Sequence, residues 1–115
     1  MSKTTDPIVI VEAARTPIGA FFGKLHSISA PQLGAAAIRG TLGLVPDFDR
    51  SLITEVLMGC VLSAGMGQAP ARQSSHLAGL ADHVGATTIN KVCGSGLQAI
   101  RYASALLSFK LKKKK

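Results

Sequence analysis

The stretch NKVCGSG, residues 90–96, is the part of the sequence that decides the fold. It joins a β-branched run, Thr87 to Val92, which predicts a strand, to an amphipathic run, Gly94 to Leu107, which predicts a helix. Cys93 therefore stands at a helix start, where unpaired backbone N–H groups and the helix dipole favour the reactive thiolate. The flanking glycines leave room for an acyl donor and for N–H groups to face an oxyanion. The stretch predicts a nucleophile for acyl transfer.

Outward from this junction, strands and helices alternate along the chain. Ile8 to Val11 and Val56 to Leu62 are apolar runs typical of buried strands. A helix is expected over 31–42, after a Ser29 cap and with Pro31 in its first turn, and another over 70–80. This order predicts an α/β fold with a parallel or mixed sheet.

The basic charge is concentrated at the end of the chain. The formal net charge is +7, but Lys110 and residues 112–115 supply five of the 13 positive charges, which leaves eight against six negative ones. We therefore expect a domain over residues 1–107 and a disordered basic tail over 108–115. Such a tail attracts polyanions without sequence preference, and no motif accompanies it, so a specific nucleic-acid partner is not expected.

The two cysteines, Cys60 and Cys93, are expected to be reduced thiols. The polar start of the chain lacks a signal peptide, and no apolar run is long enough to span a membrane, so a cytoplasmic location without membrane association is predicted. Free cysteines often simply fill space in the core, which is the alternative interpretation for Cys93. For Cys60, which lies in a strand-like apolar run, core packing is the role we expect.

The remaining polar candidates favour structural roles. His26, His76 and His83 are expected to be solvent-facing or capping residues, and Arg15 a hydrogen-bond donor to loop carbonyls. No ligand spacing indicates a metal site. Residues 94–99, GSGLQA, fit a dinucleotide-binding G-x-G-x-x-A pattern. The match is weak, because Asn90 and Lys91 stand in the preceding strand where such a site has aliphatic residues. In addition, no acidic residue follows about 20 positions further on.

Five blocks of sequence resemble the thiolase family of acyl-CoA acyltransferases, which includes acetyl-CoA acetyltransferase. They occur in the family's order and span most of the chain from Ile8 to Ala105. The last of them is similar to the family's nucleophile motif. The blocks are residues 9–19, 29–34, 58–62, 67–73 and 90–97.

The resemblance implies a function in acyl-CoA C-acyltransfer, as in fatty acid metabolism. Cys93 would take the acyl group from acyl-CoA as a thioester, before Claisen condensation or in thiolytic cleavage. Coenzyme A would be part of the substrate, and no cofactor is implied. The chain would form part of the amino-terminal half of a layered α/β fold, whose strand over residues 87–92 lies near a subunit contact in homo-oligomers.

The resemblance also implies that this chain is incomplete. A histidine, a second cysteine and a CoA-binding insertion come from parts of the family's fold that have no counterpart in these 115 residues. Two alternatives to catalysis therefore remain: an inactive truncated thiolase remnant, and a non-catalytic binding module.

Overall fold

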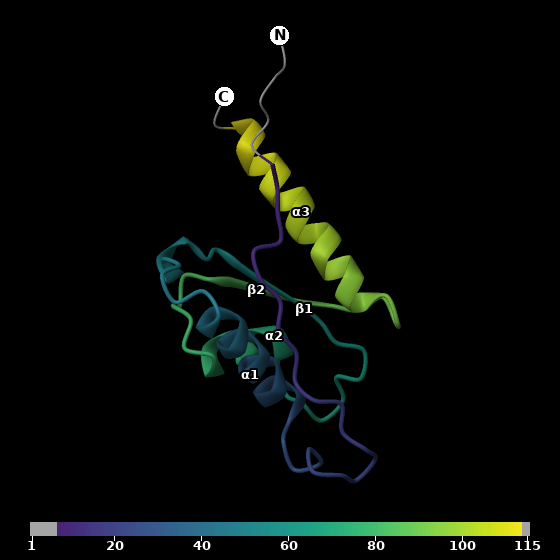
Figure 1. Ribbon diagram of the computed structural model, residues 1–115. Helices are drawn as coiled ribbons and strands as arrows, with labels where there is room; N and C mark the ends of the chain where they lie inside the picture. Colours follow the sequence, from purple (N-terminus) through teal and green to yellow (C-terminus); the bar gives the residue numbers. More distant parts are fainter. Residues whose placement is uncertain (1–6, 114–115) are drawn as a thin grey trace.

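The computed structural model describes residues 7–113 (Figure 1). The elements follow one another as helix, short 3-10 turn, strand, helix, strand and helix. In chain order they are α1 (Ala30–Gly43), η1 (Arg50–Leu52), β1 (Glu55–Gly59), α2 (Pro70–Leu77), β2 (Gly85–Ile89) and α3 (Ser95–Lys113).

The strands β1 and β2 form a parallel pair, with a register that runs from Glu55 opposite Gly85 to Gly59 opposite Ile89. Parallel strands need a crossover, and α2 supplies it. In Figure 1, α1 and α2 lie on one face of the pair and α3 lies on the other. The expected α/β class is confirmed, and Cys93 follows the carboxyl end of β2.

Helix α1 begins where local sequence signals predicted it. The Ser29 hydroxyl accepts a hydrogen bond from the Gln32 N–H, and the Gln32 side chain accepts one from the Ser29 N–H, which makes a capping box. Pro31 adds a residue whose backbone is preset for the first turn. The prediction of a helix over 31–42 is thus confirmed, with one extra residue at each end.

The core lies between the sheet and the two helices beneath it. Its fully buried members come from α1, β1 and the α2–β2 connection, and they are small or aliphatic: Ala35, Val56, Ala78, Leu80 and Val84. A side chain at Gly34 would meet the Ser74 hydroxyl at 2.6 Å and the end of Met58 at 2.9 Å. The absence of a Cβ at Gly34 therefore lets α1 approach both α2 and β1 closely.

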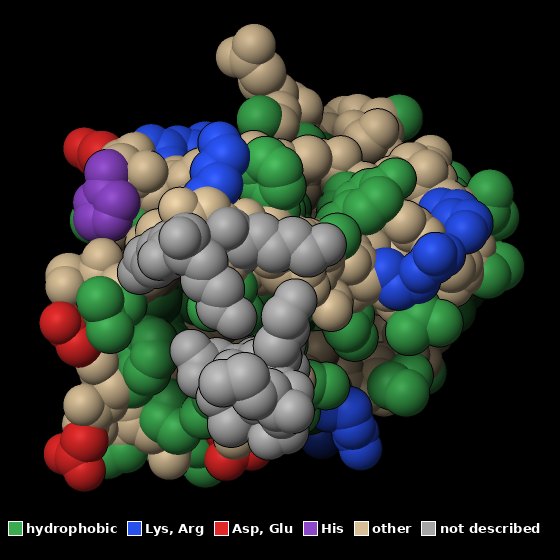
Figure 2. All heavy atoms as spheres, turned by 90° about the horizontal axis from the view of Figure 1, so that it is seen from above, with side chains coloured by type: hydrophobic (Ala, Val, Ile, Leu, Met, Phe, Trp, Pro, Cys, Tyr) green, Lys and Arg blue, Asp and Glu red, His purple; other side chains and the backbone are tan. Residues whose placement is uncertain are grey.

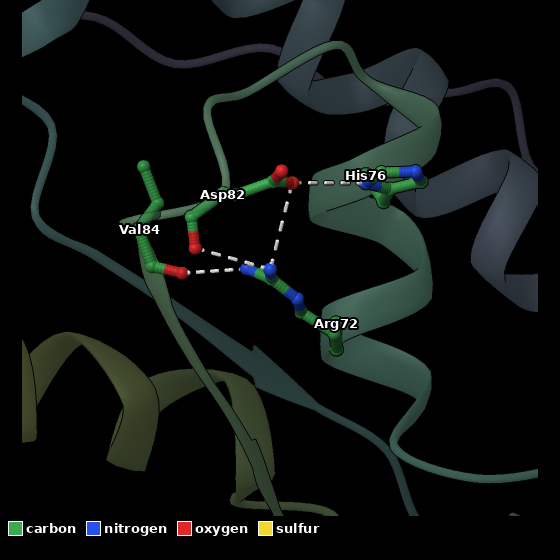
Figure 3. A network of polar contacts seen from close by, with 4 residues as sticks. All are labelled: Arg72, His76, Asp82 and Val84. Atoms are coloured by element: carbon green, nitrogen blue, oxygen red, sulfur yellow. Dashed lines mark hydrogen bonds and ion pairs between the residues drawn. The ribbon is translucent and has the colours of Figure 1, made fainter.

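Arg72 ties α2 to the segment that leads into β2 (Figure 3). Its guanidinium donates to the carbonyl oxygens of Val84 at 2.7 Å and Asp82 at 3.1 Å. The Asp82 carboxylate lies 3.8 Å from the guanidinium and 3.7 Å from Nδ1 of His76. Because the carbonyl bonds fix the backbone directly, they set where β2 begins.

The expectation of a strand over Ile8–Val11 is wrong for this structure. The segment is extended but has no ladder partner among the described residues, and its four side chains are 38% to 76% exposed. An apolar run becomes a strand only when a neighbouring strand takes up its backbone hydrogen bonds. Within residues 7–113 β1 pairs only with β2, and Figure 1 shows the amino-terminal segment crossing the sheet without joining it.

The other two strands end earlier than predicted. β1 stops at Gly59 and not at Leu62, and β2 covers 85–89 where 87–92 was expected. The reason for the second difference is local. Val92 has φ +48°, outside the extended range, and its N–H is hydrogen-bonded to the Asn90 side chain.

The expectation of a disordered tail from residue 108 is also wrong for residues 108–113, which continue α3. Lysine is a good helix former, so a lysine-rich sequence can extend a helix. The ammonium of Lys110 donates to the Thr54 hydroxyl at 2.8 Å, and that of Lys113 lies 4.7 Å from the centre of the Phe109 ring. Residues 114 and 115 lie outside the described part, as do residues 1–6.

Large apolar side chains cover much of the surface. Ile18 and Phe21, in the loop before α1, are 92% and 94% exposed, and several apolar residues of α3 are about half exposed. Figure 2 shows apolar side chains in several groups on one face of the molecule, between scattered basic ones. Exposed apolar groups of this size are typical of surfaces that another surface covers.

Candidate active site

Cys93 occupies the turn that connects β2 to α3, two residues before the helix begins. Its side chain is exposed, and its thiol is free. The turn is closed by two backbone bonds, from Gly94 N–H to the Lys91 carbonyl at 3.0 Å and from Ser95 N–H to the Val92 carbonyl at 3.1 Å. The first N–H groups of α3 have no partner inside the helix, so the thiol stands next to the positive end of a helix dipole.

Backbone strain lies immediately before the nucleophile candidate. A positive φ is unusual for any residue with a side chain and an outlier for a β-branched one, yet Val92 has φ +48°. Such conformations cost of order 1–3 kcal/mol and persist where the surroundings fix them. The bond from Val92 N–H to Asn90 Oδ1, at 2.9 Å, is one of the contacts that fix it.

Ser95 supplies the side-chain contacts of the same turn. Its side chain accepts a hydrogen bond from the Lys91 N–H at 2.8 Å and donates one to the Val92 carbonyl at 2.6 Å. The residue is only 4% exposed. One hydroxyl thus bridges the two residues that precede Cys93.

The end of β1 packs directly on this turn. A Cβ at Gly59 would lie 2.8 Å from the Gly96 nitrogen and the Ser95 carbonyl carbon, and 2.9 Å from the Ser95 Cβ. Real Cβ atoms essentially never come within 3.0 Å of such atoms, so the lack of a Cβ at Gly59 allows this approach. Gly59 therefore brings the sheet against the helix start that carries Cys93.

The structure does not bring the other sequence candidates to Cys93. Cys60 is half-buried with its thiol 3.8 Å from the Met66 sulfur, which fits the expected packing role. Arg15 donates to the Thr16 carbonyl at 3.1 Å, as expected for a structural donor.

The three histidines are exposed. Nδ1 of His26 lies 2.8 Å from the Gly23 carbonyl oxygen, and His76 faces Asp82. Among residues 7–113, no group of three or more metal-binding side chains comes together. No helix in this described part of the chain is long and apolar enough to cross a membrane.

An apolar groove of about 510 Å³ lies between β1 and α3. Aliphatic side chains of both elements form its walls, among them Leu57, Ile100 and Leu106, and Lys110 is at one end. Cys93 is not part of its lining. The groove could not be predicted from the sequence, because it forms where β1 meets a helix far along the chain: its lining residues Leu57 and Ile100 are 43 positions apart.

The contributions of Gly59 and Ser95 do not follow from sequence patterns either. Ser95 belongs to the stretch NKVCGSG, but nothing in that pattern predicts its hydrogen bonds. Its burial at a helix start, beside a glycine of another strand, could not be seen from sequence spacing.

Comparison with known proteins agrees with the resemblance of the sequence blocks to thiolases over most of the chain. Residues 8–110 match the family described as thiolase, N-terminal domain. An acetyl-CoA acetyltransferase of Saccharomyces pastorianus is 54% identical over 94 residues, which cover 81% of this chain and 24% of the yeast protein. One from Allochromatium vinosum is 52% identical over 99 residues, 84% of this chain and 24% of that protein.

The fold is also similar to that of a solved thiolase structure. The crystal structure of the Acat5 thiolase from Ascaris suum, solved in complex with coenzyme A, superimposes with a TM-score of 0.81 at 37% identity. The match covers 85% of this chain and 25% of that one.

The α/β unit, the cysteine at its last strand-to-helix turn and these matches define one class of protein: the chain belongs to the thiolase family. It corresponds to part of the family's amino-terminal domain. It spans about a quarter of the length of the relatives it matches.

Proposed function

We propose that Cys93 is the acyl acceptor of an acyl-CoA C-acyltransferase of the acetyl-CoA acetyltransferase type. The thiolate attacks the carbonyl carbon of the acyl-CoA thioester, the carbon–sulfur bond to coenzyme A breaks, and coenzyme A leaves as a thiol after taking up a proton. The acyl group then remains on Cys93 as a thioester until a second substrate takes it up.

The position of Cys93 is the observation that carries this proposal. An exposed thiol stands at the start of the 19-residue helix α3, beside the positive end of the helix dipole, and is open to a bulky donor. The flanking Gly94 has no side chain to obstruct that approach. N–H groups at a helix start are also suitable donors to the oxyanion of a tetrahedral intermediate.

The second half of the reaction needs groups that these residues do not bring to Cys93. Condensation requires a base that removes a proton from the α-carbon of the second acyl-CoA. The polar contacts of His26 and His76 are with Gly23 and Asp82, and not with Cys93. We therefore propose that a histidine and a second cysteine come from the part of the fold that the relatives have and this chain does not span.

The same proposal includes the expected partners and location. The substrate is an acyl-CoA, and the family's complete fold acts as a homo-oligomer in the cytoplasm, in pathways such as fatty acid metabolism. The domain spans residues 1–107 together with the helical extension to Lys113.

The test is acylation of the purified chain by acetyl-CoA, followed by intact-mass and peptide mass spectrometry. We expect slow addition of one acetyl group, on the peptide that contains Cys93. Cys93→Ala should abolish the addition, whereas Cys60→Ala, which removes the other thiol, should leave it unchanged.

Two outcomes would contradict the proposal. If Cys60 were acetylated as fast as Cys93, the surroundings of Cys93 would give its thiol no special reactivity. Sustained formation of acetoacetyl-CoA by this chain alone would show that it needs no further residues. Complete failure of acylation would favour the truncated, inactive remnant or the non-catalytic binding module.

A further inference from the structure

We propose that Ser95 is a positioning residue, which holds the turn of residues 91–95 so that the Cys93 thiol stays at the start of α3. The inference rests on the proposed role of Cys93 as the acyl acceptor. It assigns no contact between Ser95 and the substrate, and its effect is exerted through the backbone on either side of Cys93.

The hydrogen bonds of Ser95 are directed at the turn itself. The hydroxyl accepts from the Lys91 N–H at 2.8 Å and donates to the Val92 carbonyl at 2.6 Å. Both partners precede Cys93, whereas Ser95 follows it. The side chain therefore closes a ring of backbone around the cysteine and fixes it from both sides.

The burial of Ser95 makes these bonds strong constraints. The residue is 4% exposed, and the Gly59 backbone of β1 packs against its Cβ. Water cannot easily replace a partner at such a site, so loss of the hydroxyl leaves the Lys91 N–H without its bond. A buried polar group without a partner is costly, and the turn would relax to recover one.

Val92 provides the reason that the turn needs such support. A valine with φ +48° is strained, and a strained conformation persists only where neighbouring contacts over-determine it. The short bond from Ser95 to the Val92 carbonyl acts on that residue. Without it, Val92 can return to a negative φ, which rotates the following peptide and moves Cys93 away from the helix start.

The experiment measures alkylation of Cys93 by iodoacetamide in a Cys60→Ala background, where Cys93 is the remaining thiol. This reaction reports the reactivity of the thiol without requiring acyl-CoA. Ser95→Ala should slow alkylation roughly fivefold, the ratio expected when one net hydrogen bond is lost. Ser95→Thr keeps the hydroxyl and should recover most of the rate.

Ser75→Ala is the matched control. Ser75 is a fully buried serine of α2, and its hydroxyl has no hydrogen-bond partner among residues 7–113. Its removal should leave the alkylation rate of Cys93 unchanged. Circular dichroism and urea denaturation of every variant show whether a rate is measured on folded protein.

A second measurement covers the case in which Ser95→Thr does not fold. Hydrogen exchange of the Lys91 amide, followed by NMR, should accelerate in Ser95→Ala while amides in the middle of α3 keep their rates. Unchanged exchange at Lys91 would overturn the proposal. The proposal would also be overturned if folded Ser95→Ala were alkylated at an unchanged rate. The same holds if Ser75→Ala lost as much of the Cys93 alkylation rate, or if folded Ser95→Thr failed to recover that rate.

The two proposals fail separately. If acetyl-CoA does not acylate Cys93 but Ser95→Ala slows alkylation, the proposed function is wrong and the positioning role stands. If acylation occurs at Cys93 and the alkylation rate is insensitive to Ser95, the positioning role is wrong and the proposed function stands.

Discussion

At the scale of single residues, the site depends on a missing side chain as much as on those present. Gly59 ends β1 beside the start of α3, where a Cβ would meet backbone atoms of Ser95 and Gly96 at 2.8 Å. Backbone cannot move aside as the end of a flexible side chain can. The sheet and the turn that carries Cys93 are therefore coupled through one position.

Gly59→Ala should destabilise the chain by about 1–3 kcal/mol, the usual cost of forcing extra atoms into a packed region. It should also shift the NMR signals of the Ser95 and Gly96 amides. Urea denaturation measures the first effect. Gly43→Ala is the control, because a Cβ at Gly43 meets no atom within 4 Å; a similar loss there would show that the packing argument is wrong.

Asp49 offers a prediction about pH. The hydroxyl of Ser51, and then its backbone N–H, hold the pKa of the Asp49 carboxyl below its ordinary value. Because the folded-state pKa is the lower one, this stabilisation is present above the unfolded-state pKa and is lost as the pH falls through the folded-state value. An NMR titration of Ser51→Ala should move the Asp49 pKa upward; an unchanged titration would contradict the assignment.

At the scale of elements, local signals predicted the helices better than the strands. A cap at Ser29 and a proline at 31 act within one turn, so the start of α1 could be read from sequence. A strand depends on a partner far along the chain. The apolar run Ile8–Val11 carries no information on which strand it would join, and it joins none among the described residues.

The same distinction explains what could be predicted of the candidate site. The position of Cys93 at a helix start followed from the change of pattern around residues 90–96. Its support did not, because the approach of Gly59 to Ser95 joins positions 36 residues apart in the sequence. The strain at Val92 could not be foreseen either, since valine is a residue that ordinarily favours strands.

Arg72 allows a test of how α2 is fixed to β2. Arg72→Ala removes two bonds to backbone carbonyls and should lower the free energy of unfolding by about 1.5–3 kcal/mol, the range for hydrogen bonds with a charged partner. Asp82→Asn weakens only the ion pairs of an exposed carboxylate and should cost at most about 1 kcal/mol. Equal losses by urea denaturation would show that the ion pair, not the carbonyl bonds, holds the segment.

At the scale of the whole molecule, the distribution of apolar surface is the dominant feature. The groove between β1 and α3 is lined by aliphatic side chains, and β1 has a free edge beside it. A free strand edge next to apolar surface is a template for association. The relatives extend far beyond the region that this chain spans, and their remaining part is available to cover such a surface.

We expect the isolated chain to self-associate through this groove. Light scattering coupled to size-exclusion chromatography should give a mass that rises with concentration. Ile100→Lys places a charge in the groove and should shift the chain toward monomer, whereas Tyr102→Lys, on the same helix but outside the groove, should do so much less. A monomeric mass at every concentration would contradict this expectation.

The crossover connection also sets an order of events during synthesis. β1 and α2 leave the ribosome before β2, and Gly59 of β1 can pack against the start of α3 only after the turn around Cys93 has left it as well. Until then the cysteine lies on a flexible chain, without a helix behind it. Cys93 therefore reaches its place late in synthesis, when the strand that packs on its turn has already been made.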